Sequence, residues 1–189
     1  ATREALDDLR QRTRAAGLGE VHLNAVVWGV QVLPGETAIK DPNEMLERLG
    51  VDSVTSYVWV HHTRLDSFPR VDYARYAERA MADWPRFSEE FALPYWPNVT
   101  MGWDSSPRTV QSDGFENVGY PFTPVLEGNT PAAFGAVLRR AKAFLDQRAS
   151  QPKILTINAW NEWTEGSYLE PDTLYGMAYL EAIGAVFGG

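Results

Sequence analysis

Two glutamates, Glu162 and Glu165, stand three positions apart in the segment Trp-Asn-Glu-Trp-Thr-Glu-Gly of residues 160–166. Cleavage of a glycosidic bond needs a carboxylic acid that protonates the leaving oxygen and a second group that stabilises or traps the developing cation. Carboxyl groups about 5–5.5 Å apart suit retention, and pairs about 6.5–9.5 Å apart suit inversion. On a helical turn, residues at i and i+3 have Cβ atoms about 5–6 Å apart, so both glutamates can reach one bond. Two close carboxylates also push their pKa values apart, which would separate an acid from a base.

The residues around this pair have the types that bind sugars. Trp160 and Trp163 can stack on sugar faces, Asn161 can hydrogen-bond a hydroxyl group, and Gly166 permits a tight turn behind the pair. The alternative is a solvated acidic loop with its tryptophans packed in the core. We favour the functional interpretation because the segment closely follows an apolar, β-branched run at residues 154–157, at what we expect to be a strand end.

Helix and strand signals alternate along the chain in the order α(βα), which predicts an α/β fold of parallel strands covered by helices. A complete (β/α)8 barrel takes about 250 residues, and this chain has 189. We therefore expect a single partial-barrel domain over residues 1–189, with the N-terminal half of the barrel absent, or else a four-stranded parallel unit. The predicted helices cover residues 2–16, 41–50, 72–84 (ended or kinked by Pro85), 130–145 and 175–187, and the predicted strands cover 21–28, 53–60, 95–102 and 153–159.

Two polar connections follow predicted strands, at residues 61–71 and 103–129. The second lacks any periodic pattern, and structureless loops of this length are often functional. Both should lie at the carboxyl ends of the strands, where barrel active sites are found. We expect substrate contacts from Trp103, Asp104 and Arg108, with a loop salt bridge as the less favoured alternative for the arginine.

Two further aromatic residues, Tyr57 and Trp59, fall at a predicted strand end and are candidates for lining a sugar site, with core packing as an equal alternative. The pair His61-His62 lacks a third metal ligand at a sensible spacing, so we predict no metal site. No phosphate-binding loop is present, and we expect no cofactor.

Composition narrows the class of partner. The formal net charge of -8 argues against a general nucleic-acid or anionic-membrane binder, because those partners need a basic face, and it is compatible with a neutral carbohydrate. The absence of cysteine excludes disulfides and thiolate sites. We find no signal peptide and no run of 18 apolar residues in these 189 residues, and the compartment stays unknown.

Three segments resemble those of the WbsX or glycoside hydrolase family 99-like proteins. The most specific runs from Asn158 to Gly166 and is followed by Leu-Glu-Pro-Asp and Tyr-Gly at residues 169–172 and 175–176. The segment Gly-Trp-Asp-Ser-Ser-Pro-Arg of residues 102–108 is similar to the family's Trp-Asp-Asn-Thr-Pro-Arg block, and Ser-Tyr-Val-Trp of residues 56–59 is similar to an aromatic strand end. The resemblance extends from about residue 20 to the C-terminus.

This resemblance implies a (β/α)8 barrel and a retaining hydrolase of α-linked mannose-type or rhamnose-type units in a polysaccharide. Carried over, it implies that Glu162 is the base acting on the substrate 2-hydroxyl, giving a 1,2-anhydro sugar, and that Glu165 is the general acid and then the base. Two alternatives stay open. One is a glycosyltransferase of polysaccharide assembly, which the lack of an Asp-x-Asp motif disfavours. The other is a non-catalytic glycan-binding half-barrel, completed by a second copy or by the missing half.

Overall fold

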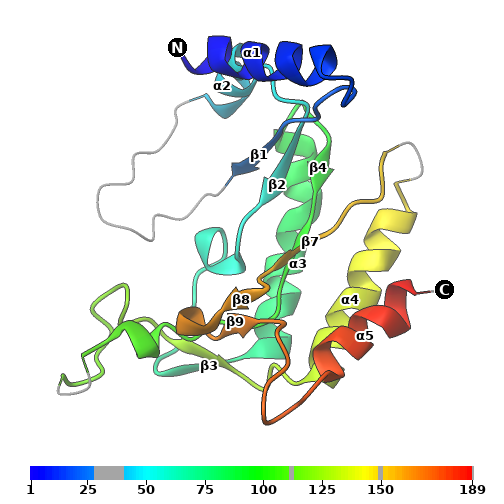
Figure 1. Cartoon of the computed structure of the whole chain (residues 1–189). Coiled ribbons are helices and arrows are strands. Elements are labelled where there is room, and N and C mark those ends of the chain that lie inside the picture. The colour runs from blue at the N-terminus through cyan, green and yellow to red at the C-terminus, as the bar shows by residue number, and fades with distance from the viewer. Residues whose placement is uncertain (28–40, 111–112, 149–150, 189) are drawn as a thin grey trace.

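The computed structural model describes residues 1–27, 41–110, 113–148 and 151–188. Helices and strands alternate through most of this range, as the sequence predicts (Figure 1). The helices are α1 Thr2–Ala15, α2 Pro42–Leu49, α3 Tyr73–Glu90, α4 Pro131–Asp146 and α5 Ala178–Phe187. The strands are β1 Asn24–Val27, β2 Ser53–Ser56, β3 Arg70–Asp72, β4 Tyr95–Trp96, β5 Asn98–Thr100, β6 Val125–Glu127, β7 Thr156–Asn158, β8 Asn161–Glu162 and β9 Ser167–Tyr168.

The central strands are parallel, which confirms the predicted α/β class. β2 pairs with β1 on one side and with β4 on the other, and β5 pairs with β7, all in parallel. The predicted third strand is divided at Pro97, which has no N–H group to donate to a ladder. Its carbonyl still accepts a hydrogen bond of 3.0 Å from Thr156 N, so β4 and β5 carry the pairing from β2 across to β7. Of the predicted strand at residues 21–28, Trp28 lies outside the described residues.

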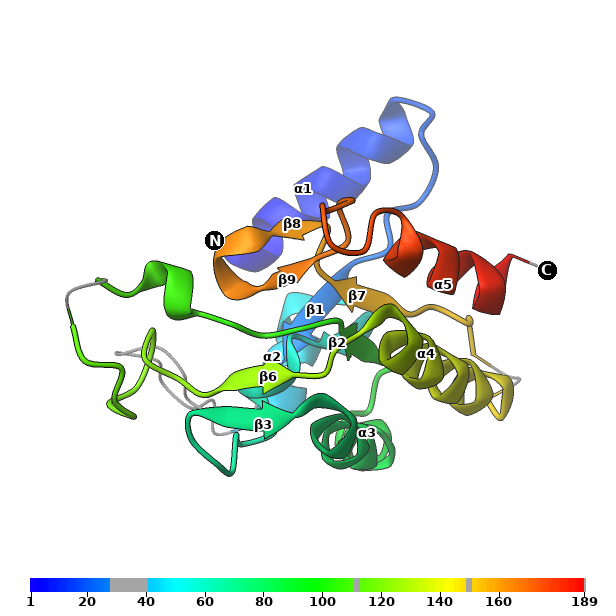
Figure 2. The ribbon, with the colours of Figure 1, turned by 90° about the horizontal axis from the view of Figure 1, so that it is seen from below.

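The two polar connections are not without structure. β3 lies in the first and β6 in the second, and the two pair in parallel from Arg70–Val125 to Asp72–Glu127 (Figure 2). Each strand is only three residues long, too short for a period-two pattern to stand out, so the pairing itself defines them. The prediction of a structureless stretch at 103–129 was therefore wrong for the residues near β6.

Helix boundaries follow local capping signals in most places. The Asp41 side chain accepts a hydrogen bond from Glu44 N, Pro42 stands at the first helical position, and Gly50 ends α2 in the left-handed conformation. Helix α4 begins in the same way at Thr130 and Pro131. Helix α5 begins at Ala178 rather than at the predicted Tyr175, because backbone N–H groups of the preceding turn bond to Asp172 instead.

Helix α3 passes through Pro85 and ends at Glu90, so of the two predicted outcomes, an end or a kink at Pro85, the end was wrong. The turn beyond the proline carries Phe87, which is 2% exposed. Phe91, the residue directly after α3, is 7% exposed. Burial of two large aromatic side chains favours continuation by several kcal/mol, roughly 2 kcal/mol or more each, which offsets the loss of one helical hydrogen bond.

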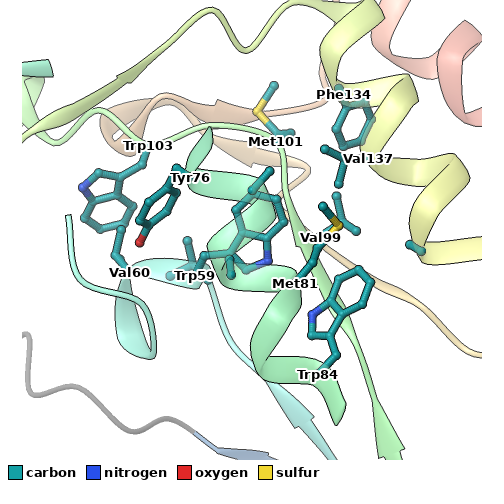
Figure 3. Packing of buried hydrophobic residues seen from close by; sticks show 14 of the residues in the cluster. Trp59, Val60, Tyr76, Met81, Trp84, Val99, Met101, Trp103, Phe134 and Val137 are labelled. Carbon is teal, nitrogen blue, oxygen red and sulfur yellow. The ribbon is translucent and has the colours of Figure 1, made fainter. Parts of the chain in front are cut away.

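Helices α3 and α4 cover one face of the strands, and a core rich in aromatic residues fills the space between them (Figure 3). Among the fully buried side chains are Trp59, Tyr73, Tyr76, Trp84 and Phe134. Helices α1 and α2 lie at the amino ends of the strands, while the β8–β9 hairpin lies at the carboxyl end (Figure 1). Within the described part of the chain, no helix is long and apolar enough to cross a membrane.

Candidate active site

The two glutamates lie on one short hairpin at the carboxyl end of β7. Glu162 ends β8, and Glu165 ends the 3-10 turn η3, Trp163–Glu165, before the chain returns as β9. In a 3-10 turn, residues three apart lie one above the other, so both side chains leave the same side of the hairpin. Gly166 adopts φ 58°, the left-handed conformation that the predicted tight turn requires.

Arg108 brings the two carboxylates together. It lies at the end of the 3-10 turn η2, Ser106–Arg108, and its Nη2 donates to Glu162 Oε1 at 2.6 Å. Its Nη1 is 3.2 Å from Glu165 Oε1, and its Nε donates to Thr164 Oγ1 at 2.9 Å. One guanidinium therefore spans both acids, and the predicted association of Arg108 with this site takes the form of ion pairs with the glutamates themselves.

Two hydroxyl groups complete this arrangement, and neither was selected from the sequence. Thr164 Oγ1 donates to Glu162 Oε1 at 2.9 Å. The Tyr120 hydroxyl accepts a hydrogen bond from Arg108 Nη1 and donates one of 3.3 Å to Glu165 Oε1. We call these five residues the Arg108 cluster: Arg108, Tyr120, Glu162, Thr164 and Glu165.

The two carboxylates have different surroundings. The Glu162 side chain is 39% exposed and that of Glu165 is 13% exposed. Burial raises the pKa of the Glu165 carboxyl above its ordinary value; Arg108 opposes the rise, the Glu162 charge adds to it, and the Tyr120 hydroxyl opposes it. A carboxyl group that keeps its proton to higher pH is suited to act as an acid.

The loop that carries Arg108 is tightly joined to the hairpin. Asp104 N donates to Glu165 O at 2.6 Å, and Ser167 Oγ donates to Gly102 O at 2.6 Å. A Cβ added at Gly166 would stand 2.7 Å from Asp104 Cβ, so glycine is needed for this approach. Asp104 Oδ1 accepts from Ser106 N at 2.9 Å, which fixes η2. The observed contacts of Asp104 are thus structural, and a contact with substrate stays a prediction.

Three predicted aromatic residues are exposed near the carboxylates. Trp160 is 53% exposed, Trp163 is 43% exposed and Tyr57 is 39% exposed. Burial raises the pKa of the Tyr57 hydroxyl, and the charges of Glu165 and then Glu162 add to the rise, which places this tyrosine within electrostatic reach of both. Asn161, in β8 opposite Tyr168, is also exposed.

One face of the Trp163 ring is already covered. Tyr168 stacks on it with ring centroids 3.7 Å apart and an interplanar angle of 16°. Trp163 Nε1 donates to Glu170 Oε2 at 2.6 Å, and Tyr168 OH donates to Asp172 Oδ2 at 3.2 Å. The Leu-Glu-Pro-Asp segment therefore holds the orientation of both rings.

The other two predicted aromatic residues are in the core. Trp59 is 0% exposed, and its Nε1 donates to Asn98 O at 2.9 Å; Trp103 is 2% exposed, and its Nε1 donates to Thr123 Oγ1 at 3.0 Å. Neither ring has a face that a sugar can reach in this structure. Their assignment to substrate binding is corrected to core packing (Figure 3), because an aromatic residue at a strand end can point inward as easily as outward.

A hollow of about 390 Å³ is found at the amino ends of the strands, lined by Arg10, Arg14, Glu20, Val21, His22 and Asp52. Its arginines are already paired, Arg10 with Asp52 and Arg14 with Glu20. The carboxylate pair is therefore a better candidate for an active site than this hollow. The described residues contain no group of three histidine, aspartate or glutamate side chains arranged to hold a metal ion.

One family model and two curated proteins match this chain. Residues 2–183 match the family model described as glycosyltransferase WbsX. An uncharacterized protein WxcX from Xanthomonas campestris pv. campestris strain B100, and its counterpart from strain ATCC 33913, are each 34% identical over 87 residues, which is 46% of this chain and 11% of theirs.

A solved structure described as a glycoside hydrolase-like protein has a similar fold. It superposes with a TM-score of 0.61 at 17% sequence identity, over 98% of this chain and 49% of that chain. The mixed α/β arrangement with parallel strands is thus that of a glycoside hydrolase-like fold. This chain spans about half the length of that protein and a smaller part of its curated relatives.

Proposed function

This chain belongs to the WbsX family, and on that premise we propose that it carries the carboxylate pair of a glycoside hydrolase. The observation that supports this is the pair itself: Glu162 and Glu165 share one guanidinium but differ in exposure, 39% against 13%. Holding two like charges together is unfavourable, and sites that do so commonly divide them into an acid and a base.

In the proposed reaction, Glu165 is the proton donor and Glu162 is the base. Glu162 takes the proton of the substrate 2-hydroxyl as that oxygen attacks the anomeric carbon, while Glu165 gives its proton to the leaving oxygen. Glu165 then takes a proton from water, which opens the 1,2-anhydro ring, and Glu162 returns its proton to the 2-oxygen. The route requires a 2-hydroxyl trans to the leaving group, as in α-mannosides and α-rhamnosides.

The exposed aromatic residues supply the proposed binding surface. Trp160 and the open face of Trp163 would stack on sugar rings, and Tyr57 and Asn161 would contact hydroxyl groups. No cofactor is required for this chemistry.

The test is substitution of each glutamate by glutamine within the natural protein that contains this chain. Glu165→Gln and Glu162→Gln should each lower the hydrolysis of an α-mannan or α-rhamnan by about 10²-fold to 10⁴-fold, the range for loss of a general acid or base. Hydrolysis that survived both changes would exclude the pair. Glu127→Gln, in β6 and exposed, is a matched control that should leave the rate unchanged.

A glycosyltransferase is the second candidate, because the family model bears that description. Transfer from a nucleotide sugar needs a site for a diphosphate, and the sequence has no Asp-x-Asp motif. Titration calorimetry with nucleotide sugars distinguishes the two: heat of binding that is lost in Arg108→Ala would favour a transferase.

We propose further that the strands form half of a (β/α)8 barrel. In the described residues β1 pairs only with β2, and β7 only with β5, so each has a free edge. Exposed apolar side chains lie on or near these edges, Val26 at 49% and Ile154 at 37%. Free edges invite pairing with more strands, from the rest of the protein or from a second copy. Light scattering tests this for the isolated chain, since a stable and active monomer would count against it.

A further inference from the structure

Each nitrogen of the Arg108 guanidinium contacts another residue of the Arg108 cluster. Nε bonds to Thr164, Nη2 bonds to Glu162, and Nη1 contacts both Tyr120 and Glu165. A substrate that used Arg108 as its binding group would have to displace these partners. The arginine is therefore better suited to orient the two carboxylates than to clamp a sugar.

Each carboxylate also has a hydroxyl group of its own. Thr164 Oγ1 is 2.9 Å from Glu162 Oε1, and Tyr120 OH is 3.3 Å from Glu165 Oε1. Thr164 lies on the hairpin between the two glutamates, whereas Tyr120 belongs to the separate connection between η2 and β6. The placement of Tyr120 therefore needs packing that the hairpin does not supply.

That packing is present in the described part of the connection. Tyr120 lies beside buried Trp103, with ring centroids 6.4 Å apart, and the Arg108 guanidinium carbon is 5.9 Å from the Tyr120 ring centroid. Two residues further on, Phe122 contacts Phe115, which stacks on Phe68 with centroids 5.3 Å apart. These contacts anchor the segment and direct the Tyr120 hydroxyl at the carboxylate pair.

We propose that Tyr120 positions the Glu165 carboxyl group for proton transfer, by accepting a hydrogen bond from Arg108 and donating one to Glu165. The effect of Tyr120 on activity rests on the proposed role of Glu165 as the acid. Its effect on the proton affinity of Glu165 does not, and can be measured without any substrate.

The charged and titratable groups that act on Glu165 are Arg108, Glu162, Tyr57 and Tyr120. Of these, Tyr120 is the neutral hydrogen-bond donor, and a donor to a carboxylate favours the ionised form. Without its hydroxyl group, burial and the Glu162 charge are opposed by Arg108 alone. The Glu165 carboxyl should then hold its proton to still higher pH.

The direct experiment follows the carboxyl carbon of Glu165 by NMR in the ¹³C-labelled chain during a pH titration. Tyr120→Phe, which keeps the ring, should move the Glu165 midpoint to higher pH. The matched control Thr164→Val removes the hydroxyl bonded to Glu162 and should move the Glu165 midpoint much less. Equal movement in both variants, or none in Tyr120→Phe, would overturn the proposal.

A second variant distinguishes the effect of the Tyr120 hydrogen bond from that of altered folding or packing. Fluorotyrosine at position 120 keeps the ring and makes the hydroxyl group a stronger donor, so it should move the Glu165 midpoint to lower pH, opposite to Tyr120→Phe. Movement in the same direction in both variants would mean that Tyr120 acts only through packing, and would exclude the proposal.

Activity supplies the third measurement. If Glu165 is the acid, Tyr120→Phe should shift the alkaline limb of the pH–rate profile upward and lower kcat by about tenfold through misplacement. A titration that moves as expected, in a protein that cleaves no glycan, would leave the positioning role standing and remove the proposed hydrolase. A profile unshifted in an active enzyme would remove the role of Tyr120 in catalysis.

Discussion

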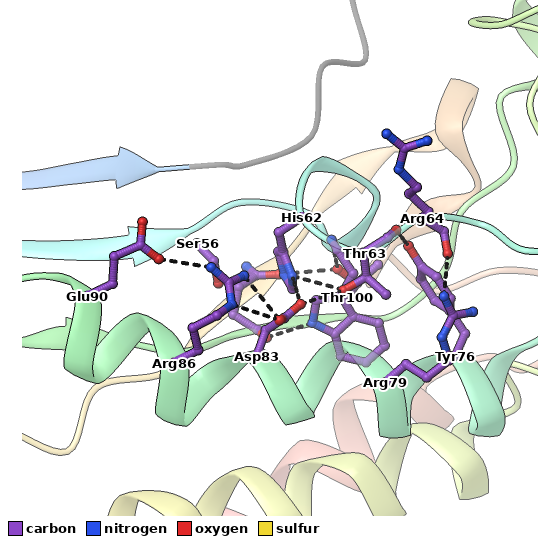
Figure 4. Close-up of polar contacts among 12 residues, drawn as sticks. Ser56, His62, Thr63, Arg64, Tyr76, Arg79, Asp83, Arg86, Glu90 and Thr100 are labelled. Carbon is purple, nitrogen blue, oxygen red and sulfur yellow. Dashed lines mark hydrogen bonds and ion pairs between the residues drawn. The ribbon is translucent and has the colours of Figure 1, made fainter. Parts of the chain in front are cut away.

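The Arg108 cluster and a second polar cluster, between the turn after β2 and helix α3, use similar side chains in different ways. The second cluster, which we call the His62 network, consists of His62, Thr63, Asp83 and Arg86 (Figure 4). His62 Nδ1 is 3.1 Å from Asp83 Oδ2, and Thr63 Oγ1 donates to the same oxygen at 3.0 Å. Here a single carboxylate serves several donors, and it joins the 3-10 turn η1, Trp59–His61, and its following residues to α3.

The difference lies in the balance of charge. In the His62 network several hydrogen-bond donors share the one carboxylate of Asp83, so these contacts stabilise the fold. In the Arg108 cluster two carboxylates share one cation, and Glu165 is buried with its pKa raised. An arrangement that keeps like charges close stabilises the fold less and suits chemistry better.

Loss of the Asp83 carboxylate should produce the largest change in stability. Asp83→Ala removes the acceptor that the wholly buried His62 side chain and the Thr63 hydroxyl share, and leaves only the 3.0 Å contact between Thr63 Oγ1 and His62 Nδ1. We expect the free energy of unfolding to fall by about 2–3 kcal/mol, measured by urea denaturation. Glu89→Ala, at an exposed position of the same helix, is the control and should change stability by less than about 0.5 kcal/mol. Equal losses in the two variants would contradict a structural role for the network.

Two glycines of similar backbone conformation test the contact between the Arg108 loop and the hairpin. Gly166 has φ 58° and Gly176 has φ 55°, but a Cβ at Gly166 meets Asp104 Cβ at 2.7 Å, whereas a Cβ at Gly176 has no described atom within 4 Å. Gly176→Ala should cost about 1 kcal/mol, from backbone strain alone. Gly166→Ala should cost more, and should alter the NMR signals of Glu165. Equal losses of stability in the two variants, measured by thermal denaturation, would mean that the crowding at Asp104 is unimportant.

The two clusters should respond to pH with opposite signs. Burial lowers the pKa of His62, and hydrogen bonds from His62, Arg86 and Thr63 outweigh burial to lower the pKa of Asp83. The unfolded chain therefore binds more protons at both sites. Their contribution to stability is lost as pH falls, from about 6.5 downward for His62 and from about 3.9 downward for Asp83.

Glu165 behaves in the other direction, because its folded-state pKa is raised. Its folded form binds the extra proton, so stability falls as pH rises from about 4.3 to the raised value. Relative to the unaltered chain, Glu165→Gln should gain stability as pH rises, and Asp83→Asn should lose it. A tenfold change in proton affinity corresponds to about 1.4 kcal/mol. Urea denaturation at several pH values measures how the stability of each variant, relative to the unaltered chain, changes with pH. Changes of the same sign in both variants would contradict the predicted difference between the two clusters.

The smallest effect is expected at the support of Trp163. Glu170→Gln weakens the hydrogen bond from Trp163 Nε1 but leaves the stack on Tyr168 in place. We expect KM for a glycan to rise a few-fold, roughly 2–5 fold, with kcat nearly unchanged, since the ring contributes to binding rather than to proton transfer. Glu181→Gln, at an exposed position of α5, is the control. A fall in kcat without a change in KM would argue against a binding role.

The sequence predicts the central strands and the helix starts of this molecule better than it predicts the connections between them. The strands of the central sheet carry β-branched or apolar runs, and capping residues such as Asp41 and Thr130 mark helix starts directly. In contrast, β3 and β6 exist because they pair with each other across 55 residues, from Arg70 to Val125. Helix α3 runs past Pro85 because Phe87 is buried, and no local signal carries that information.

The candidate site divides in the same way. Glu162, Glu165 and their exposed neighbours Trp160 and Trp163 are recognised from spacing and residue type. Arg108 was expected near substrate, and its position between the two carboxylates follows from tertiary structure. Tyr120 was missed because it lies in a connection without periodicity. Trp59 and Trp103 were misassigned because burial depends on the direction of a side chain, which a strand end does not specify.

If Glu165 is the acid and Glu162 the base, the two variants should differ in how their rates depend on the leaving group. Aryl α-mannosides and α-rhamnosides with acidic phenols need no protonation, whereas those with weakly acidic phenols do. We predict that Glu165→Gln releases acidic phenols at a near-normal rate in the first step, measured as a burst or with azide in place of water as the nucleophile, and loses the second group, while Glu162→Gln is inactive on both. Equal loss on both groups in Glu165→Gln, or activity of Glu162→Gln on either, would contradict the assignment.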